Sequence, residues 1–122
     1  MTYEVRPTVP ADWLALAGAP APVAHRGMTA LADDEAQAIM GLAYTGPHLQ
    51  AFLNIREGSP ERHPGLVRAG LRAMRQMLES VGRPVRVVAD GPRAPYLLHW
   101  MGFAPNGRWN GMDVWTHPGE PV

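Results

Sequence analysis

A strand, a helix and a second strand follow one another in the back half of the chain, and this order constrains the fold more than any other feature. Apolar runs cover His48–Ile55 and Pro84–Asp90. Between them, from Leu66 to Val81, apolar side chains recur at helical spacing, with arginines on the opposite face. A strand that returns to the same sheet through a helix makes a right-handed crossover, so we predict a sheet with helices packed against it.

The front half supplies further strands. Thr2–Val9 is predicted to form a first strand, and Pro10 begins a short helix that Gly18 ends. Two apolar runs, Met28–Leu31 and Ala36–Tyr44, flank an acidic turn, which is typical of a hairpin. Strands joined by a hairpin are antiparallel, so the sheet is expected to be mixed.

The last part of the chain adds a short helix and one or two strands. The helix is predicted over Pro92–Met101, and the final strand over Met112–His117, near two Asn-Gly turn signals. This element order is that of a mixed sheet with helices on both sides. We therefore expect one α/β (or α+β) domain over residues 1–118, with residues 119–122 as a frayed tail.

Composition excludes several classes of function. The chain has 122 residues and no cysteine, so disulfides, thiolate metal sites and a cysteine nucleophile are excluded. Its 11 basic residues are all arginine, so Schiff-base chemistry on a lysine is excluded as well. They balance 11 acidic residues, and this neutrality argues against nucleic-acid binding. No apolar stretch suits a signal peptide or a membrane span, so a cytoplasmic protein is expected.

The histidines give no indication of a metal site. None of them is spaced from another like a pair of ligands one helical turn apart. They are His25, His48, His63, His99 and His117. We therefore expect no metal.

The loop before the long helix is the first candidate site. A helix N-terminus presents unpaired N–H groups and a partial positive charge, so it accepts phosphate groups readily. The stretch from Arg62 to Val67 reads Arg-His-Pro-Gly-Leu-Val. It resembles the pyrophosphate loop of the GNAT superfamily of acyl-CoA-dependent N-acetyltransferases, whose pattern is Arg or Gln, two residues, Gly, one residue, then Gly or Ala. Arg62 and Gly65 match, whereas Val67 places a β-branched side chain at the last position.

A second stretch, from Gly91 to Phe103, carries the stronger resemblance to the same superfamily. It is similar to a family segment that starts with Asn-Pro-x-Ala and ends with Gly-Phe. The matching residues are Pro92, Ala94, Leu97, Met101, Gly102 and Phe103. Gly91 replaces the family's asparagine, and Leu98 replaces its tyrosine, a general acid for the departing thiolate. Tyr96 lies about 200° away round a helix, so it does not simply take over that position.

The resemblance implies a mixed, mostly antiparallel sheet of six or seven strands with helices on both faces. It also implies binding of acetyl-CoA, or another acyl-CoA, and transfer of the acyl group to an amine on a small molecule, a peptide or a protein. Cofactor contacts are then expected at Leu53, Asn54 and Ile55 of the strand, at Arg62, His63, Gly65, Leu66 and Val67 of the loop, and at Gly91 and Arg93. Glu57, just after the strand, is the expected general base.

An inactive homologue is the alternative. The replaced tyrosine and asparagine, the side chain of Val67 and the short front half favour a GNAT-fold protein that binds or supports a partner without catalysis. Such a protein resembles the small GNAT-like proteins that tailed phages encode, some of which are packaged in virions. In that case we expect to find it in the host cytoplasm or in the virion. A homodimer, or a complex with another protein, is left open.

Overall fold

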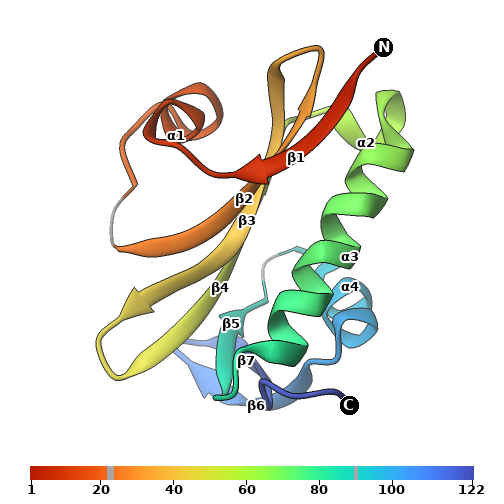
Figure 1. The fold of residues 1–122 in the computed structure, drawn as a ribbon. Coiled ribbons are helices and arrows are strands. Elements are labelled where there is room, and N and C mark those ends of the chain that lie inside the picture. Colours follow the sequence, from red (N-terminus) through yellow and green to blue (C-terminus); the bar gives the residue numbers. More distant parts are fainter. Residues whose placement is uncertain (22–23, 90) are drawn as a thin grey trace.

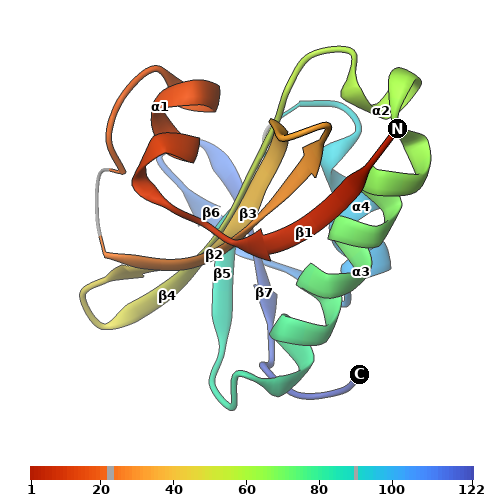
Figure 2. The same ribbon diagram turned by 45° about the horizontal axis from the view of Figure 1, so that its top comes forward.

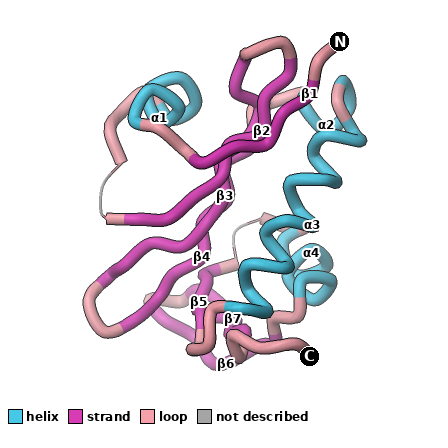
Figure 3. Tube along the Cα trace, viewed as in Figure 1, coloured by secondary structure: helices cyan, strands magenta, loops and turns pink. Residues whose placement is uncertain are grey.

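Seven strands form one sheet in the computed structural model, which describes residues 1–21, 24–89 and 91–122 (Figure 1). The strands are β1 (Tyr3–Pro7), β2 (His25–Ala32), β3 (Glu35–Thr45), β4 (His48–Ile55), β5 (Val85–Val88), β6 (Ala104–Trp109) and β7 (Met112–His117). The helices are α1 (Pro10–Ala17), α2 (Ser59–Arg62), α3 (Pro64–Ser80) and α4 (Ala94–Met101), and Figure 3 follows them along the chain. The order across the sheet is β1-β2-β3-β4-β5-β7-β6.

The sheet is mixed, as predicted. Neighbouring strands run antiparallel except β4 and β5, which are parallel and joined by the crossover through α3. Asp33 and Asp34 connect β2 to β3 with φ angles of 48° and 65°, a left-handed conformation that aspartate tolerates better than most residues. The predicted hairpin is therefore confirmed, although β2 begins earlier, at His25. β4 begins and ends where the sequence predicts.

Helices cover both faces of the sheet. Figure 1 and the turned view in Figure 2 show α1 on one side, and α3 with α4 on the other. We call these sides the α1 face and the α3 face. The main core lies on the α3 face, where α3 approaches the sheet closely at Gly70: a Cβ atom there would lie only 2.8 Å from the terminal methyl carbon of Met40.

Alternation along a strand sorts its side chains between the two faces. In β4, Leu49 and Ala51 belong to the core on the α3 face. Gln50 and Phe52 therefore point to the α1 face, where the ring of Phe52 packs 5.2 Å from that of Trp13 in α1. The same rule assigns Arg86 and Val88 of β5 to the α1 face, because their neighbours Val85 and Val87 pack in the core.

The long helix is confirmed, with an earlier start. α3 begins at Pro64, where the missing N–H of proline costs no helical hydrogen bond. It ends at Ser80, and its buried residues are Leu66, Val67, Gly70, Met74 and Leu78. One element was missed: α2, a single turn over Ser59–Arg62 between β4 and α3.

β5 differs from its prediction. The run was expected to be covered on both faces, but only Val85 is fully buried, and Arg86, Val87 and Val88 are half-buried. The expectation is wrong there because β5 pairs with β4 over two residues only, so its far half borders open space. Asp90, the predicted end of this strand, lies outside the described residues.

The C-terminal tail packs against the turn after α3. Gly119 is buried, and its C=O accepts a 2.9 Å hydrogen bond from the N–H of Gly82. Its Cα lies so close to the backbone of Arg83 that a Cβ atom would meet the carbonyl oxygen at 2.1 Å. Fraying therefore does not begin at residue 119, and the exposed end of the tail is residues 120–122.

Candidate functional site

The parallel strands β4 and β5 part after a short contact. Their register pairs are Leu49 with Val85 and Gln50 with Arg86. β4 continues to Ile55 and β5 to Val88 without further pairing between them. Backbone N–H and C=O groups on the facing edges are therefore left to bind something else. A gap opens in the middle of the sheet, beyond Gln50 and Arg86.

A hollow of about 650 Å³ lies over this gap, and we call it the α4 hollow. It is lined by residues 50–53 of β4, by Val87 and Val88 of β5, and by Arg93, Ala94, Tyr96, Leu97 and Leu98. Its volume is that of a small-molecule site, and its walls are mainly apolar. An extended chain with amide groups fits such a gap, because the amides can replace the missing strand partner.

A second hollow, of about 340 Å³, lies on the α1 face, and we call it the α1-face hollow. Its lining includes Thr45, His48, Arg86, Trp109 and Val114. It shares Gln50, Val87 and Val88 with the α4 hollow. The two hollows therefore meet where β4 and β5 part.

The loop between β4 and α3 is tied to β3. The N–H of Arg56 donates a 2.7 Å hydrogen bond to the C=O of Gln37, and the side chain of Arg56 donates another to the C=O of Ala36 at 2.9 Å. The hydroxyl of Ser59, which is fully buried, donates to the side chain of Gln37. These contacts fix the loop and α2 against β3, and α2 leads directly into α3.

The first turn of α3 is open where the sequence predicts phosphate binding. A Cβ atom on Gly65 would meet no atom within 4 Å. The guanidinium of Arg62 folds back over the loop, close to Gly58, and donates a 3.3 Å hydrogen bond to the C=O of Glu57. Arg62 is exposed, so its charge is available next to the helix N-terminus.

Three other predicted loop residues face inward. His63 is buried, and its Nδ1 shares a 3.1 Å hydrogen bond with the hydroxyl of Tyr3 in β1. The side chains of Leu66 and Val67 are buried as well. The N–H of Val67 donates to the C=O of His63, so it closes the first turn of the helix. Val67 therefore does not place its side chain in the open region next to Gly65.

The remaining predicted residues divide into two groups. Leu53 and Arg93 line the α4 hollow, as does Leu98, the residue at the family's tyrosine position. The rest lie outside the described lining of both hollows: Asn54 and Ile55 in the last part of β4, Gly91 before α4, and Glu57 in the exposed turn after β4. Tyr96 lines the α4 hollow with 84% of its surface exposed.

Sequence reasoning missed the α1-face hollow. His48 and Gln50 are alternate residues of a correctly predicted strand, but their neighbours Arg86 and Trp109 come from distant strands. The strand alternation alone predicts which face each side chain takes. The pairing of Gln50 with Arg86 decides which of them meet, and no residue pattern in the sequence encodes it.

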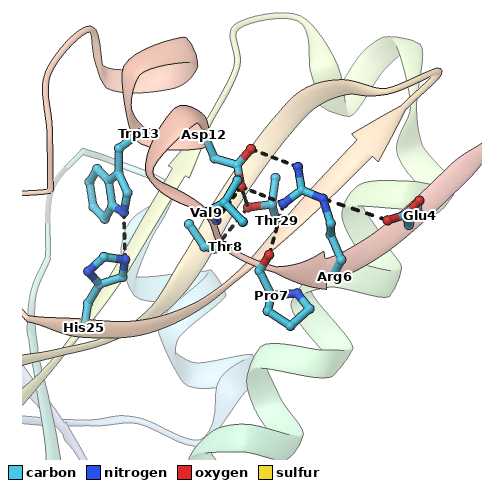
Figure 4. A network of polar contacts seen from close by, with 9 residues as sticks. All are labelled: Glu4, Arg6, Pro7, Thr8, Val9, Asp12, Trp13, His25 and Thr29. Carbon is cyan, nitrogen blue, oxygen red and sulfur yellow. Dashed lines mark hydrogen bonds and ion pairs between the residues drawn. The ribbon is translucent and has the colours of Figure 1, made fainter.

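A buried polar network fixes α1 on its face of the sheet (Figure 4). The carboxylate of Asp12 accepts hydrogen bonds from Arg6 at 2.8 and 3.1 Å, from Thr29 at 2.7 Å and from the N–H of Val9 at 2.9 Å. Burial alone would raise the pKa of Asp12, but these bonds outweigh it and lower the pKa to about 2.

The network continues to the edge of the site. Trp13, next to Asp12, donates a 2.8 Å hydrogen bond from its ring nitrogen to Nε2 of His25. Both rings pack against Phe52, which lines the α4 hollow. Helix α1 therefore helps to position one wall of the gap.

No group of three or more potential metal ligands occurs in the described part of the chain. Among the same residues, no helix is long and apolar enough to cross a membrane. The described site consists of backbone groups, apolar walls and arginines, a set that suits an organic ligand with phosphate groups.

No protein-family model and no curated protein matches this sequence. Solved structures do match it over nearly its whole length. The ribosomal-protein-S18-alanine N-acetyltransferase of Escherichia coli is 13% identical with a TM-score of 0.71, and the match covers 99% of this chain and 96% of that one. An N-acetyltransferase of Staphylococcus aureus Mu50 is 10% identical with a TM-score of 0.72, covering 98% and 100%.

A third similar structure contains coenzyme A. It is the PaiA N-acetyltransferase of Thermoplasma acidophilum, solved in complex with that molecule. It is 10% identical with a TM-score of 0.62, and the match covers 97% of this chain and 99% of that one. At such low identity the agreement concerns the fold, and it extends from β1 to β7. The chain therefore has the fold of the GNAT N-acetyltransferases.

Proposed function

We propose that this protein binds acetyl-CoA, or another acyl-CoA, in the gap between β4 and β5 and transfers the acyl group to an amine. The observation that carries this proposal is the pair of parallel strands that separates after Gln50 and Arg86, with a hollow of about 650 Å³ over the gap. The open N-terminus of α3 lies at the far end of β4, so one long ligand with a phosphate group can reach both features.

Each predicted region has a distinct part in this proposal. The first turn of α3, at Gly65, and the guanidinium of Arg62 bind the pyrophosphate. The free edge of β4 around Leu53 accepts the amide-bearing arm, and Leu97 and Leu98 of α4 close the hollow over it. The acyl group then lies at the junction of the two hollows. A cytoplasmic location is part of the proposal.

Acyl transfer here depends mainly on positioning. The unpaired backbone N–H groups of β4 beyond Gln50 are donors for the carbonyl oxygen of the acyl group. Leu98 has no proton to give to the departing sulfur, but a thiol with a pKa of about 8.5 leaves readily as a thiolate. Alignment of the amine with the carbonyl carbon supplies the remaining acceleration.

A binding protein without catalysis is the second candidate. The buried, apolar side chain of Leu98 favours it, because no tyrosine stands at that position of the hollow. Under this alternative the protein binds coenzyme A or a protein partner and has no turnover. The two candidates differ in whether free thiol appears when acetyl-CoA and an amine are both present.

Isothermal titration with acetyl-CoA, coenzyme A and desulfo-CoA tests acyl-CoA binding, which the first candidate requires and which the second includes when its ligand is coenzyme A. We expect micromolar dissociation constants for all three ligands, because the pyrophosphate contacts are common to them. Absence of heat at millimolar ligand would contradict acyl-CoA binding. Release of free thiol, measured with a panel of amines, then separates the enzyme from the binding protein.

A further inference from the structure

The α1-face hollow offers a second way to the junction between β4 and β5. It lies across the sheet from α3 and α4 and shares Gln50, Val87 and Val88 with the α4 hollow. A cofactor in the α4 hollow would leave this side as the open approach to the acyl carbon. The side chains of the α1-face hollow therefore determine which acceptors can enter.

Arg86 supplies the charge of this hollow. No hydrogen bond or ion pair joins its guanidinium to any residue in the described part of the chain, although the residue is half-buried. The described lining contains no carboxylate that could neutralise it. An arginine of a half-buried residue without a partner favours a ligand that brings an anion, and a carboxylate matches the two parallel N–H donors of a guanidinium.

The position of Arg86 limits the distance between that anion and the amine. Arg86 pairs with Gln50, and this is the last register pair before the strands separate. The Cα of Arg86 therefore lies where the gap begins, and its side chain lines the hollow that opens onto the place proposed for the acyl carbon. A small molecule that carries its amine one carbon from its carboxylate can lie between these two points.

The other walls of the hollow are apolar. Val88 and Val114 lie opposite each other on β5 and β7, and Trp109 of β6 adds an indole ring that is 56% exposed. At about 340 Å³ the hollow is at the small end of ligand sites. This shape suits one apolar or aromatic side chain. A polyamine has no anion for Arg86. Its ammonium groups would need carboxylates in the lining, and the described lining contains none.

We propose that the α1-face hollow binds the acceptor, and that the acceptor is a free α-amino acid with an apolar or aromatic side chain, its carboxylate held by Arg86. This inference rests on the proposed function. It assigns Arg86 to substrate recognition, and it makes the free carboxylate of the acceptor the feature that the protein selects.

Matched acceptors test the inference. Thiol release from acetyl-CoA is measured with the common amino acids, and for the best of them with its amide and its decarboxylated amine; spermidine serves as the polyamine. We expect the free acid to exceed the other three about tenfold to a hundredfold in kcat/KM, the range for one charge-assisted bidentate contact. Equal rates for acid and amide, or a preference for spermidine, would overturn the assignment.

Arg86→Gln, with Arg72→Gln as its control, tests whether Arg86 is the residue that recognises the carboxylate. Arg86→Gln should lower kcat/KM for the free acid to the level of the amide and leave the amide unchanged. Arg72→Gln, on the exposed side of α3, should leave both unchanged. If Arg86→Gln lowers acid and amide equally, Arg86 does not recognise the carboxylate.

Titration with acetyl-CoA distinguishes a failure of the proposed function from a failure of the acceptor assignment alone. Binding by the wild type and by Arg86→Gln shows that both proteins are folded and that the α4 hollow works. If neither binds, the proposed function fails and the acceptor assignment falls with it. If acetyl-CoA binds but no amino acid is acetylated, each is titrated into the protein saturated with desulfo-CoA, and absence of binding there overturns the acceptor assignment alone.

Discussion

Gln50 and Arg86 form the last register pair between β4 and β5, and both side chains point to the α1 face. This residue pair is thus the last of the parallel contact between β4 and β5, and the gap begins directly after it. Because Gln50 lines both hollows, a change at this residue acts on the proposed cofactor site and on the proposed acceptor site together. Arg86 lines the α1-face hollow and not the α4 hollow, so a change there tests the acceptor site alone.

Gly65→Asp separates cofactor binding from stability. The Cβ of the new side chain meets no atom within 4 Å, so the substitution introduces no clash at its first atom. At a helix N-terminus a negative charge stabilises the helix by about 0.3–1 kcal/mol, so the melting temperature should stay the same or rise slightly. The same charge repels a pyrophosphate, and we expect acetyl-CoA binding to weaken at least tenfold in isothermal titration.

Gly65→Ala is the matched control for that experiment. It adds only the methyl group, for which there is room, so it should retain most of the affinity for acetyl-CoA. Wild-type affinity in Gly65→Asp would remove the first turn of α3 from the binding site.

Two residues compete for the role of general base. Glu57, the base expected from the sequence, lies in an exposed turn outside the described lining of both hollows. His48 lines the α1-face hollow on the same strand face as Gln50, and an imidazole nitrogen is a common proton acceptor in catalysis. We expect His48→Gln to lower kcat/KM by about 10²-fold.

Glu57→Gln should then stay close to the wild-type rate. The opposite result, a loss of about 10²–10⁴-fold in Glu57→Gln with a wild-type rate in His48→Gln, would return the role to Glu57. Titration of both variants with acetyl-CoA checks that cofactor binding is intact.

Asp12→Asn should destabilise the fold by about 3 kcal/mol, because it leaves the guanidinium of Arg6 without its buried partner. The pKa of Asp12 is lowered from 3.8 to about 2, so its ionised form stabilises the folded state. That contribution is complete above pH 3.8 and is lost as the pH falls toward 2, a difference of about 2 kcal/mol.

Urea unfolding of Asp12→Asn and the wild type, at pH 7 and near pH 2, measures this dependence. The difference in free energy of unfolding should be large at pH 7 and should shrink near pH 2. A difference that is constant with pH would mean that Asp12 acts through packing and neutral hydrogen bonds alone.

His117 should also make stability fall with falling pH, in a higher pH range than Asp12. Its side chain is fully buried: Nδ1 accepts a 2.9 Å hydrogen bond from the N–H of Gly119, and Nε2 has no partner among the described residues. Burial lowers the pKa of His117; Glu79 of α3 acts in the opposite sense, and Arg75 adds to the lowering. The unfolded chain therefore binds a proton more readily than the folded protein does.

The contribution of His117 is fully present above pH 6.5, the ordinary value, and is lost as the pH falls toward the lowered pKa. Urea unfolding between pH 7.5 and 5 should show this slope for the wild type and for His99→Gln, whose side chain is exposed. His117→Gln should be less stable at pH 7.5 and should lack that part of the slope. An unchanged slope in His117→Gln would assign the pH dependence to other groups.

The parts of the fold that the sequence predicts are those with strong local signals. α3 combines an apolar face with Pro64 at its start, and β4 follows directly after the Gly46–Pro47 turn. α2 was missed because four residues, Ser59–Arg62, are too few to show a helical period. Local pattern thus predicts an element when the element is long enough to repeat it.

Part of the geometry of the candidate site has a similar basis in the sequence. The placement of Gly65 in the first turn of α3 and of Leu53 in β4 follows from motif position along the chain, and their roles stay predictions. The burial of Val67 does not, because it depends on how α3 is rotated against the sheet. The acceptor side depends entirely on which strands become neighbours, and so it required the three-dimensional structure.

The bond between Tyr3 and His63 joins the first strand to the residue that precedes α3. β1 lies at one edge of the sheet, far along the strand order from the gap, yet through this bond it supports the loop proposed to bind pyrophosphate. Removal of the first three residues would delete this bond, and with it a support of the loop that lies 60 positions further along the chain. The start of the chain therefore belongs, in mechanical terms, to the far end of the proposed cofactor site.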